Sequence, residues 1–190
     1  MNSPGTLIIS INGDPGSGKS SVAKELAKTL HFKHYSGGDM RGLLAKERGI
    51  TIDELNKLGE NDPSTDKDVD AKVVELGKKQ DDCIIDSRTA WHFIPHSIKV
   101  FLKTDAKVAA ERIFKDRQQK KTTRTDEPQY RSPADVEKHL ATRVASDKKR
   151  YKKYYGFDHT DPKHYDLVLD TTHMTIEQAV ERVLAFVKTK

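Results

Sequence analysis

The stretch GDPGSGKSS, residues 13–21, lies between an apolar run, TLIISIN, and a helical pattern, VAKELAKTL. It fits the spacing G-x-x-x-x-G-K-[ST], in which glycines let the backbone curl so that successive N–H groups point at one phosphate. A helix that starts directly after such a loop presents its positive N-terminal end to the same anion. Strand, loop and helix therefore predict a phosphate-binding loop.

The loop residues carry different expected roles. Lys19 would reach the β and γ phosphates of ATP and act in catalysis, and the Ser20 hydroxyl would bind Mg²⁺. The alternative is a glycine-rich turn that binds nothing, which the flanking strand and helix disfavour. The residues expected to hold ATP are Gly13, Asp14, Pro15, Gly16, Ser17, Gly18, Lys19, Ser20 and Ser21.

The composition is that of a soluble single-domain protein. The chain has 190 residues, 33% of them charged, and a mean hydropathy of -0.75. No apolar run approaches the roughly 18 residues that span a bilayer, and the N-terminus lacks the pattern of a signal peptide. The single cysteine, Cys83, lies in an apolar run, so we expect a buried thiol and a cytoplasmic location. The net charge of +5 attracts anions in general and does not single out nucleic acid.

Strand patterns alternate with helical patterns along the chain. This alternation predicts a parallel sheet covered on both faces, with ligands at the carboxyl ends of the strands. The final pattern, TIEQAVERVLAFVK, repeats apolar residues at helical spacing. The expected strands are residues 6–11, 32–36, 83–86, 98–103 and 165–170.

Two regions interrupt the alternation. Residues 38–79 contain three short amphipathic helical patterns where one crossover would suffice, and Ser64 is the expected N-cap of the third. Residues 118–132, QQKKTTRTDEPQYRS, are polar and have no period. A loop of this length in a compact domain is typical of a functional lid or of disorder.

The chain resembles the nucleoside monophosphate kinases of the P-loop class, and within them the cytidylate kinases. The segments that carry the resemblance occur in the family's order: GDPGSGKSS, HYSGGDMR, DSR, FLKTDAKVAAERI, RVASDKKRYKKYYG and YDLVLDTTHMT. The resemblance implies an α/β fold, a P-loop NTPase three-layer sandwich with a five-stranded parallel sheet, a helical NMP-binding insert and a lid. It implies one domain, 1–190, with the core at 1–37, 80–117 and 156–190, the insert at about 38–79, and the lid and following helix at about 118–155.

The resemblance assigns acceptor-binding residues in the segment after the second strand. Ser36 and Arg41 resemble the S-G-x-x-x-R with which cytidylate kinases hold the acceptor, the arginine on its phosphate, and Asp39 lies between them. An alignment on the G-D-M-L-R of adenylate kinases instead places Gly42 at the arginine position. One residue turns a helix by about 100°, so the sequence leaves both registers open.

Asp86 and Arg88, in DSR after the third strand, resemble the D-G-R of the family. A carboxylate at this strand end would hold the waters of Mg²⁺, and the arginine would reach the acceptor phosphate or base. Ser87 stands where the family usually has glycine. The alternative is a surface ion pair.

Arginines are concentrated around the expected lid. Phosphoryl transfer builds negative charge that arginines can stabilise. Arg143 and Arg150 match the R-x-x-x-x-x-x-R-Y of archaeal-type cytidylate kinases and, with Arg112, the hinge arginine that packs over adenine, are expected to be catalytic. Arg117 lies at the entrance of the expected lid, and Arg124 and Arg131 within it are candidate anion hooks or solvated loop charges.

Three further patterns in the sequence bear on possible ligands. KKRYKKYYGF could bind nucleic acid through basic and aromatic side chains, but a helix end stopped by Gly156 is the preferred interpretation. Thr171–Met174 occupy the place where the family packs adenine. The eight histidines show no metal-ligand spacing, so we expect no transition-metal site.

The predicted reaction is ATP + NMP ⇌ ADP + NDP. CMP or dCMP comes first as acceptor from the resemblance, followed by UMP or AMP, with shikimate as a small-molecule alternative. Rival interpretations are an ATP-dependent RNA-binding or RNA-processing protein and a nucleotide-binding regulator without turnover. We expect ATP and Mg²⁺ as cofactors, small nucleotides as partners, neither membrane nor nucleic acid as a partner, and a monomer.

Overall fold

The computed structural model describes residues 7–79, 82–119 and 129–190. Five parallel strands form one sheet in the order β2-β3-β1-β4-β5, which confirms the predicted α/β fold. The ends of the expected strands shift by at most two residues. The strands are β1 Ile8–Gly13, β2 Lys33–Ser36, β3 Cys83–Asp86, β4 Ile98–Lys103 and β5 Leu167–Asp170.

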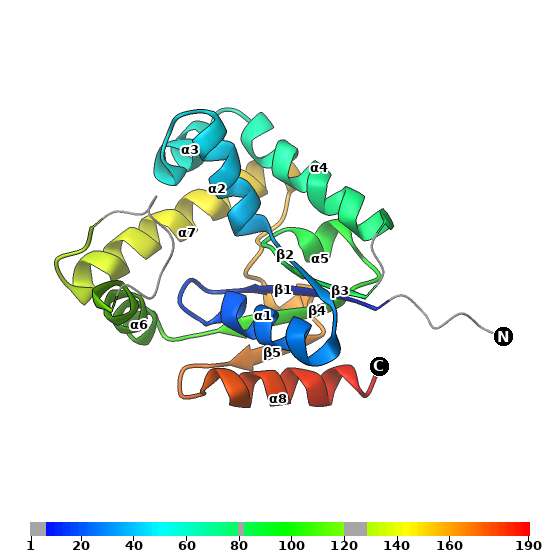
Figure 1. Cartoon of the computed structure of the whole chain (residues 1–190). Coiled ribbons are helices and arrows are strands. Elements are labelled where there is room, and N and C mark those ends of the chain that lie inside the picture. The colour runs from blue at the N-terminus through cyan, green and yellow to red at the C-terminus, as the bar shows by residue number, and fades with distance from the viewer. Residues whose placement is uncertain (1–6, 80–81, 120–128) are drawn as a thin grey trace.

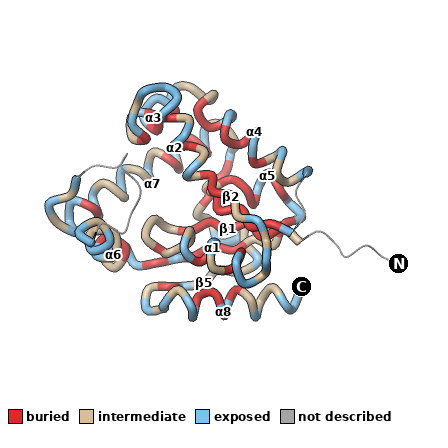
Figure 2. Tube along the Cα trace, in the orientation of Figure 1, coloured by how far each residue is buried: buried red, intermediate tan, exposed pale blue. Residues whose placement is uncertain are grey.

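Helices cover both faces of the sheet (Figure 1). Helices α1 (Lys19–Leu30) and α8 (Ile176–Val187) pack with Ile9 and Ile11 of β1 on one face. Ile8, whose side chain points the other way, packs with α4 (Ser64–Lys79) and α5 (Ala90–Phe93). Figure 2 shows the buried residues concentrated along the central strands and the inner sides of these helices. Burial on both faces explains why β1 begins with the consecutive apolar residues Ile8 and Ile9 and β3 with Cys83, Ile84 and Ile85.

The connection from β2 to β3 carries three helices, as the sequence predicts: α2 (Gly37–Glu47), α3 (Ile52–Gly59) and α4. We call this segment the insert. It has a small core of its own, formed by Ala45, Ile52 and Leu55. A capping box at Thr51 starts α3.

The prediction of Ser64 as N-cap of α4 is wrong. Ser64 is the first residue of the helix, and both its backbone N–H and its hydroxyl donate to the Asp62 carboxylate, at 2.9 Å each. Aspartate accepts such bonds more strongly than a serine hydroxyl because it is charged. Asp62, two residues earlier, therefore organises this helix start.

The segment between β4 and β5 passes over the carboxyl ends of the strands (Figure 1). Helices α6 (Ala106–Gln118) and α7 (Pro133–Tyr155) pack against each other, and α7 continues to α3 of the insert (Figure 1). The predicted stop at Gly156 is confirmed, because this glycine adopts φ 79 at the C-cap of α7. A short 3₁₀ helix, Pro162–His164, precedes β5. None of the described helices is long and apolar enough to span a membrane.

Candidate active site

The phosphate-binding loop has the backbone that its glycines predict. Gly16 and Gly18 adopt φ 79 and φ 83, a region that other residues enter at a cost. The Asp14 N–H donates to the Leu102 carbonyl at 2.9 Å, which ties the loop to β4. Gly16 lies so close to α6 that an added Cβ would stand 2.7 Å from the Ala109 Cβ. The loop is therefore held between β4 and α6 with no room for a side chain at this position.

The carboxyl ends of three strands bring the next group together. Asp86 is paired in register with Ser36 of β2 and with Ile11 of β1. The Ser20 hydroxyl, in the first turn of α1, donates to the Asp86 carboxylate at 2.6 Å. A hydroxyl and a carboxylate in contact form an oxygen ligand set of the kind that Mg²⁺ prefers. These two residues thus fit the metal position expected from the sequence.

Two pockets meet at this point. One, which we call the loop pocket, lies on residues 15–16 and 18–21 of the phosphate-binding loop together with Arg117, Tyr130 and Arg143. The other, which we call the insert pocket, lies between the strand ends, the insert and α7. Lys19, Ser20, Arg88 and Arg143 line both pockets. The insert pocket is lined by Lys19, Ser20, Ser36, Gly37, Gly38, Arg41, Asp66, Val69, Asp70, Asp86, Ser87, Arg88, Thr89, Arg143 and Tyr151.

Of the two registers that the sequence leaves open, the one on Arg41 names a residue in the lining of the insert pocket, and Gly42 is not in that lining. Arg41 is 7% exposed and lines the insert pocket. Its Nη1 donates to the Asp66 carboxylate at 2.9 Å, and its Nε donates to Asn56 at 2.8 Å. Its Nη2 is buried and has no hydrogen-bond partner in the described part of the chain. A guanidinium that lines a pocket is suited to bind an anion there.

A buried ion-pair network links the insert, the β3 end and α7. Asp147 of α7 contacts Arg88 Nε at 2.7 Å and also pairs with Arg150. Arg150 in turn lies 3.4 Å from Asp66 of the insert. Burial raises the pKa of Asp147, but the coulombic effect of Arg88, Arg150 and Arg143 outweighs it and holds the pKa at about 2. Asp147 is therefore ionised at neutral pH.

The three arginines expected to be catalytic lie in three different places. Arg143 faces the two pockets. Arg150, with 0% exposure, lies inside the network and outside the lining of both pockets. Arg112 lines a third pocket with Met174 and Ile176, where its Nη2 donates at 2.9 Å to the carbonyls of Thr171 and Thr172. The structure thus places Arg112 beside the segment where adenine was expected, away from the insert pocket.

Other expected site residues also lie apart from the two pockets. Asp39 is on the exposed side of α2, where its N–H donates to the Ser36 hydroxyl at 3.2 Å. Gly13, Asp14 and Ser17 support the loop without lining either pocket; the Asp14 carboxylate accepts from the Thr104 N–H at 3.1 Å. Arg131 is exposed, and Arg124 falls outside the described residues.

Sequence reasoning missed several pocket residues on the insert and on α7. Asp66 and Asp70 are four residues apart on α4, a spacing that places both on one helix face. This spacing was a usable signal. Tyr130, which precedes α7, and Tyr151 of α7 carried no such signal in the sequence, because only the tertiary packing brings them to the pockets.

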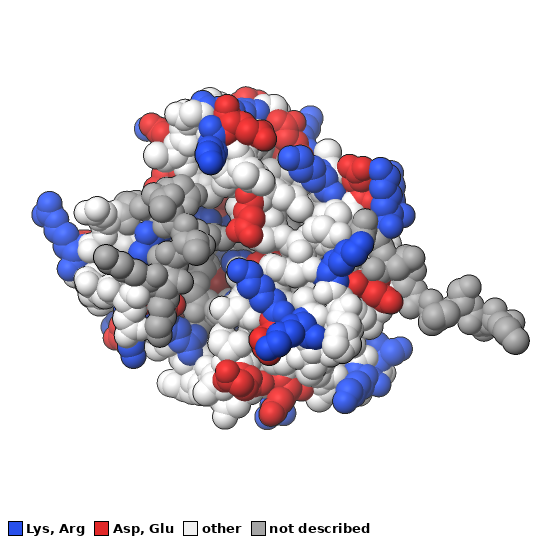
Figure 3. Space-filling view, in the orientation of Figure 1, with Lys and Arg blue, Asp and Glu red and all other residues white. Residues whose placement is uncertain are grey.

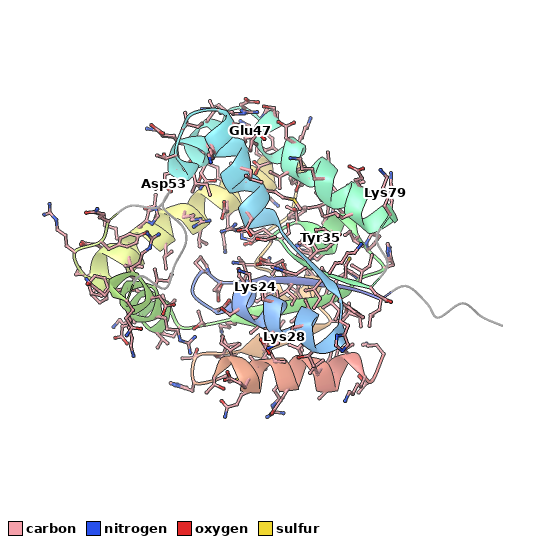
Figure 4. The ribbon with its side chains drawn as sticks, viewed as in Figure 1. Lys24, Lys28, Tyr35, Glu47, Asp53 and Lys79 are labelled. Carbon is pink, nitrogen blue, oxygen red and sulfur yellow. The ribbon has the colours of Figure 1, made fainter. Side chains whose placement is uncertain are left out.

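Contacts outside the pockets also join the insert to α7. His139 of α7 lies 3.1 Å from the Asp53 carboxylate of α3 and 2.6 Å from the Tyr130 hydroxyl. Figure 4 labels Asp53 on the part of the insert next to α7. The insert is thereby connected to the helix that carries Arg143.

The chain is similar over most of its length to proteins of one known family. The cytidylate kinase-like family matches residues 8–173. A cytidylate kinase from Methanocella arvoryzae is 40% identical over 87% of this chain and 88% of its own length, and one from Halobacterium salinarum is 36% identical over 94% and 88%. A shikimate kinase from Bacteroides thetaiotaomicron is similar in fold, with a TM-score of 0.64 at 14% identity over 97% of this chain and 99% of that one.

The family match covers most of the chain and includes the phosphate-binding loop, the β3 end and α7. The shikimate kinase, at 14% identity, shares the fold alone. The chain belongs to the cytidylate kinase-like family of P-loop phosphotransferases.

Proposed function

We propose that this protein transfers the γ-phosphoryl group of ATP to CMP or dCMP. The observation that carries the proposal is the pair of adjoining pockets that share Lys19, Ser20, Arg88 and Arg143. A donor phosphate held by the loop and an acceptor phosphate held by the insert would meet at these shared residues. The curated relatives named cytidylate kinase support a cytidine acceptor.

The acceptor phosphate would lie against Arg41 and Arg88. Arg41 lines the insert pocket, and Arg88 lines both pockets while Asp147 holds its Nε. An acceptor phosphate oxygen is already anionic, so the reaction needs no strong general base. These arginines would instead orient that oxygen and offset the charge of two phosphates brought together.

Lys19 and Arg143 would stabilise the transferring group from the two sides of the shared region. Ser20 and Asp86, in contact at 2.6 Å, would hold Mg²⁺, which neutralises phosphate charge when bound. Arg112 would position adenine through the backbone of Thr171 and Thr172, whose carbonyls it holds. In this proposal Arg150 acts through Asp147 and Asp66 as a positioning residue.

The test is ADP release from Mg-ATP with CMP, dCMP, UMP, AMP, GMP or shikimate supplied separately. Strong stimulation by CMP or dCMP is the expected result. If another acceptor stimulates more strongly, the reaction class stands and the cytidine assignment is wrong. If none raises ADP release above the ATP-only rate, the proposal fails altogether.

The rival RNA-binding interpretation is tested on the same preparation. Positive and negative side chains are interspersed over the face seen in Figure 3, whereas backbone binding to a polynucleotide needs a basic track. Affinity for RNA that exceeds the affinity for mononucleotides and falls steeply with salt would favour that rival.

A further inference from the structure

Asp70 of α4 is a buried carboxylate in the insert pocket with its own set of donors. It is 6% exposed. Thr89, next to Arg88 at the β3 end, donates to its Oδ1 at 2.6 Å, and the Tyr155 hydroxyl of α7 donates to its Oδ2. An ionised carboxylate has about four lone-pair sites, so two donors leave acceptor capacity for a ligand.

The position of Asp70 follows from that of Asp66. Asp66 pairs with Arg41, the arginine that would hold the acceptor phosphate. Asp70 is four residues further on the same helix, or about 6 Å along its axis, and both residues line the same pocket. A nucleotide whose phosphate lies at Arg41 could therefore bring its base to Asp70.

The ionised form of Asp70 is costly to the fold. Burial raises its pKa to about 6, because the hydrogen bonds from Thr89 and Tyr155 only partly oppose the loss of hydration. A neutral residue would fill the same space without this cost. Costly polar groups of this kind are retained where function requires them.

We propose that Asp70, oriented by Thr89 and Tyr155, determines specificity by accepting a hydrogen bond from the exocyclic amine of the acceptor base. Cytosine carries such an amine where uracil carries a carbonyl, and carboxylates pair with the cytosine amine for this reason. With uracil, two acceptors would face each other and the carboxylate would gain no hydrogen bond from the base. This inference rests on the proposed nucleoside monophosphate kinase function and adds the residue that selects the base.

The test compares kcat/KM for CMP and UMP in the wild type and in Asp70→Asn. Asparagine has nearly the same shape but offers both a donor and an acceptor, so it can pair with either base. The CMP-to-UMP ratio is expected to exceed one in the wild type and to fall by about 10- to 100-fold in the variant. Dissociation constants for CMP and UMP measured without ATP should change in the same direction.

Asp68→Asn is the matched control. It makes the same substitution on the same helix, but Asp68 is exposed and pairs with Arg48 at 3.2 Å, outside the pocket. It should leave the ratio within twofold of the wild type. If Asp70→Asn also leaves the ratio unchanged, or if the wild type does not prefer CMP to UMP, the inference is overturned.

Failure of the proposed function has a different signature, because the wild type would then phosphorylate neither CMP nor UMP. If Asp70→Asn does not fold, Tyr155→Phe decides the question. It keeps the charge of Asp70 and removes one of its two donors. A fall in the ratio of about threefold or more supports the inference, and an unchanged ratio contradicts it.

Discussion

At the scale of single residues, Asp147 holds two arginines that come from different segments. It contacts Arg88 from the β3 end and Arg150 from its own helix, and it is 2% exposed. Removing either partner of a buried ion pair destabilises the fold, because it leaves the other charge buried without a counter-charge. Asp147 therefore positions Arg88, which lines both pockets.

Asp147→Asn should lower the free energy of unfolding at pH 7 by about 3 to 5 kcal/mol, because it leaves buried arginines without a counter-charge. The pKa of Asp147 is about 2 in the fold against an ordinary value of 3.8. The ionised carboxylate thus stabilises the fold at neutral pH, and this contribution is lost as the pH falls from about 4 to about 2. Urea unfolding over this range should show the wild type and the variant converging.

Asp135→Asn is the control for this measurement, since Asp135 is exposed in the first turn of the same helix. It should cost less than about 1 kcal/mol. A difference between wild type and Asp147→Asn that is independent of pH would contradict the role assigned to the ionised carboxylate.

Lys19→Ala should reduce kcat by at least about 100-fold, because it removes a positive charge where the two pockets meet. The thermal midpoint should change little, since Lys19 is in the first turn of α1 and is not buried. Lys24→Ala removes the same charge from the exposed side of the same helix (Figure 4) and should leave kcat unchanged. Near-normal turnover in Lys19→Ala would refute the assignment of the loop.

At the scale of elements, the close contact between the loop and α6 can be tested at Gly16. Gly16→Ala should lower stability by about 1 to 3 kcal/mol and displace the loop, because φ is 79 and the new Cβ would meet Ala109 at 2.7 Å. A loss in kcat/KM for ATP should accompany the loss in stability. Thermal melts measure the loss in stability, and initial rates at varied ATP concentration measure the loss in kcat/KM.

Gly49→Ala separates the effect of a positive φ from the effect of a clash with a neighbouring helix. Gly49 has φ 67 but nothing within 4 Å of an added Cβ, so this variant has the backbone strain without the clash. It should lose about 1 kcal/mol and keep full activity. If Gly16→Ala behaved in the same way, the packing of the loop against α6 would not matter for nucleotide binding.

At the scale of the whole molecule, the two pockets should behave as one extended site. A bisubstrate in which adenosine and cytidine are joined through five phosphates would occupy both pockets across Lys19 and Arg88. It should raise the thermal midpoint more than ATP and CMP do when added together at the same concentrations. Binding stabilises the fold by RT ln(1 + [L]/Kd), and a single linked ligand loses translational and rotational entropy once, whereas two separate ligands lose it twice.

A matched compound with the same adenosine and phosphates but no cytidine should give a smaller shift. Equal shifts for the two compounds would mean that the insert pocket does not bind the nucleoside, which would contradict the proposed acceptor.

Much of this protein could be predicted from local sequence. The phosphate-binding loop, the five strands and the helix stop at Gly156 depend on neighbouring residues: spacing of glycines, apolar runs and a positive φ. The contact between Ser20 and Asp86 was also predictable, because Ser20 follows β1 and Asp86 ends β3, and the carboxyl ends of both strands lie at the same edge of a parallel sheet. Even local features were not all predicted correctly: Ser64 was expected to be the N-cap of α4, but it is the first residue of the helix and donates to the Asp62 carboxylate.

Backbone preference and apolar periodicity act within a few residues, and they were enough to predict the α/β fold and the phosphate-binding loop. The charged side chains that line the pockets could be picked out only once the chain was folded. Arg41 rather than Gly42 faces the insert pocket, Arg150 is buried with Asp147 and Asp66, and Arg112 lies beside Thr171. The reason is that an arginine's role depends on which carboxylates and carbonyls surround it, and here those come from segments far apart in the chain.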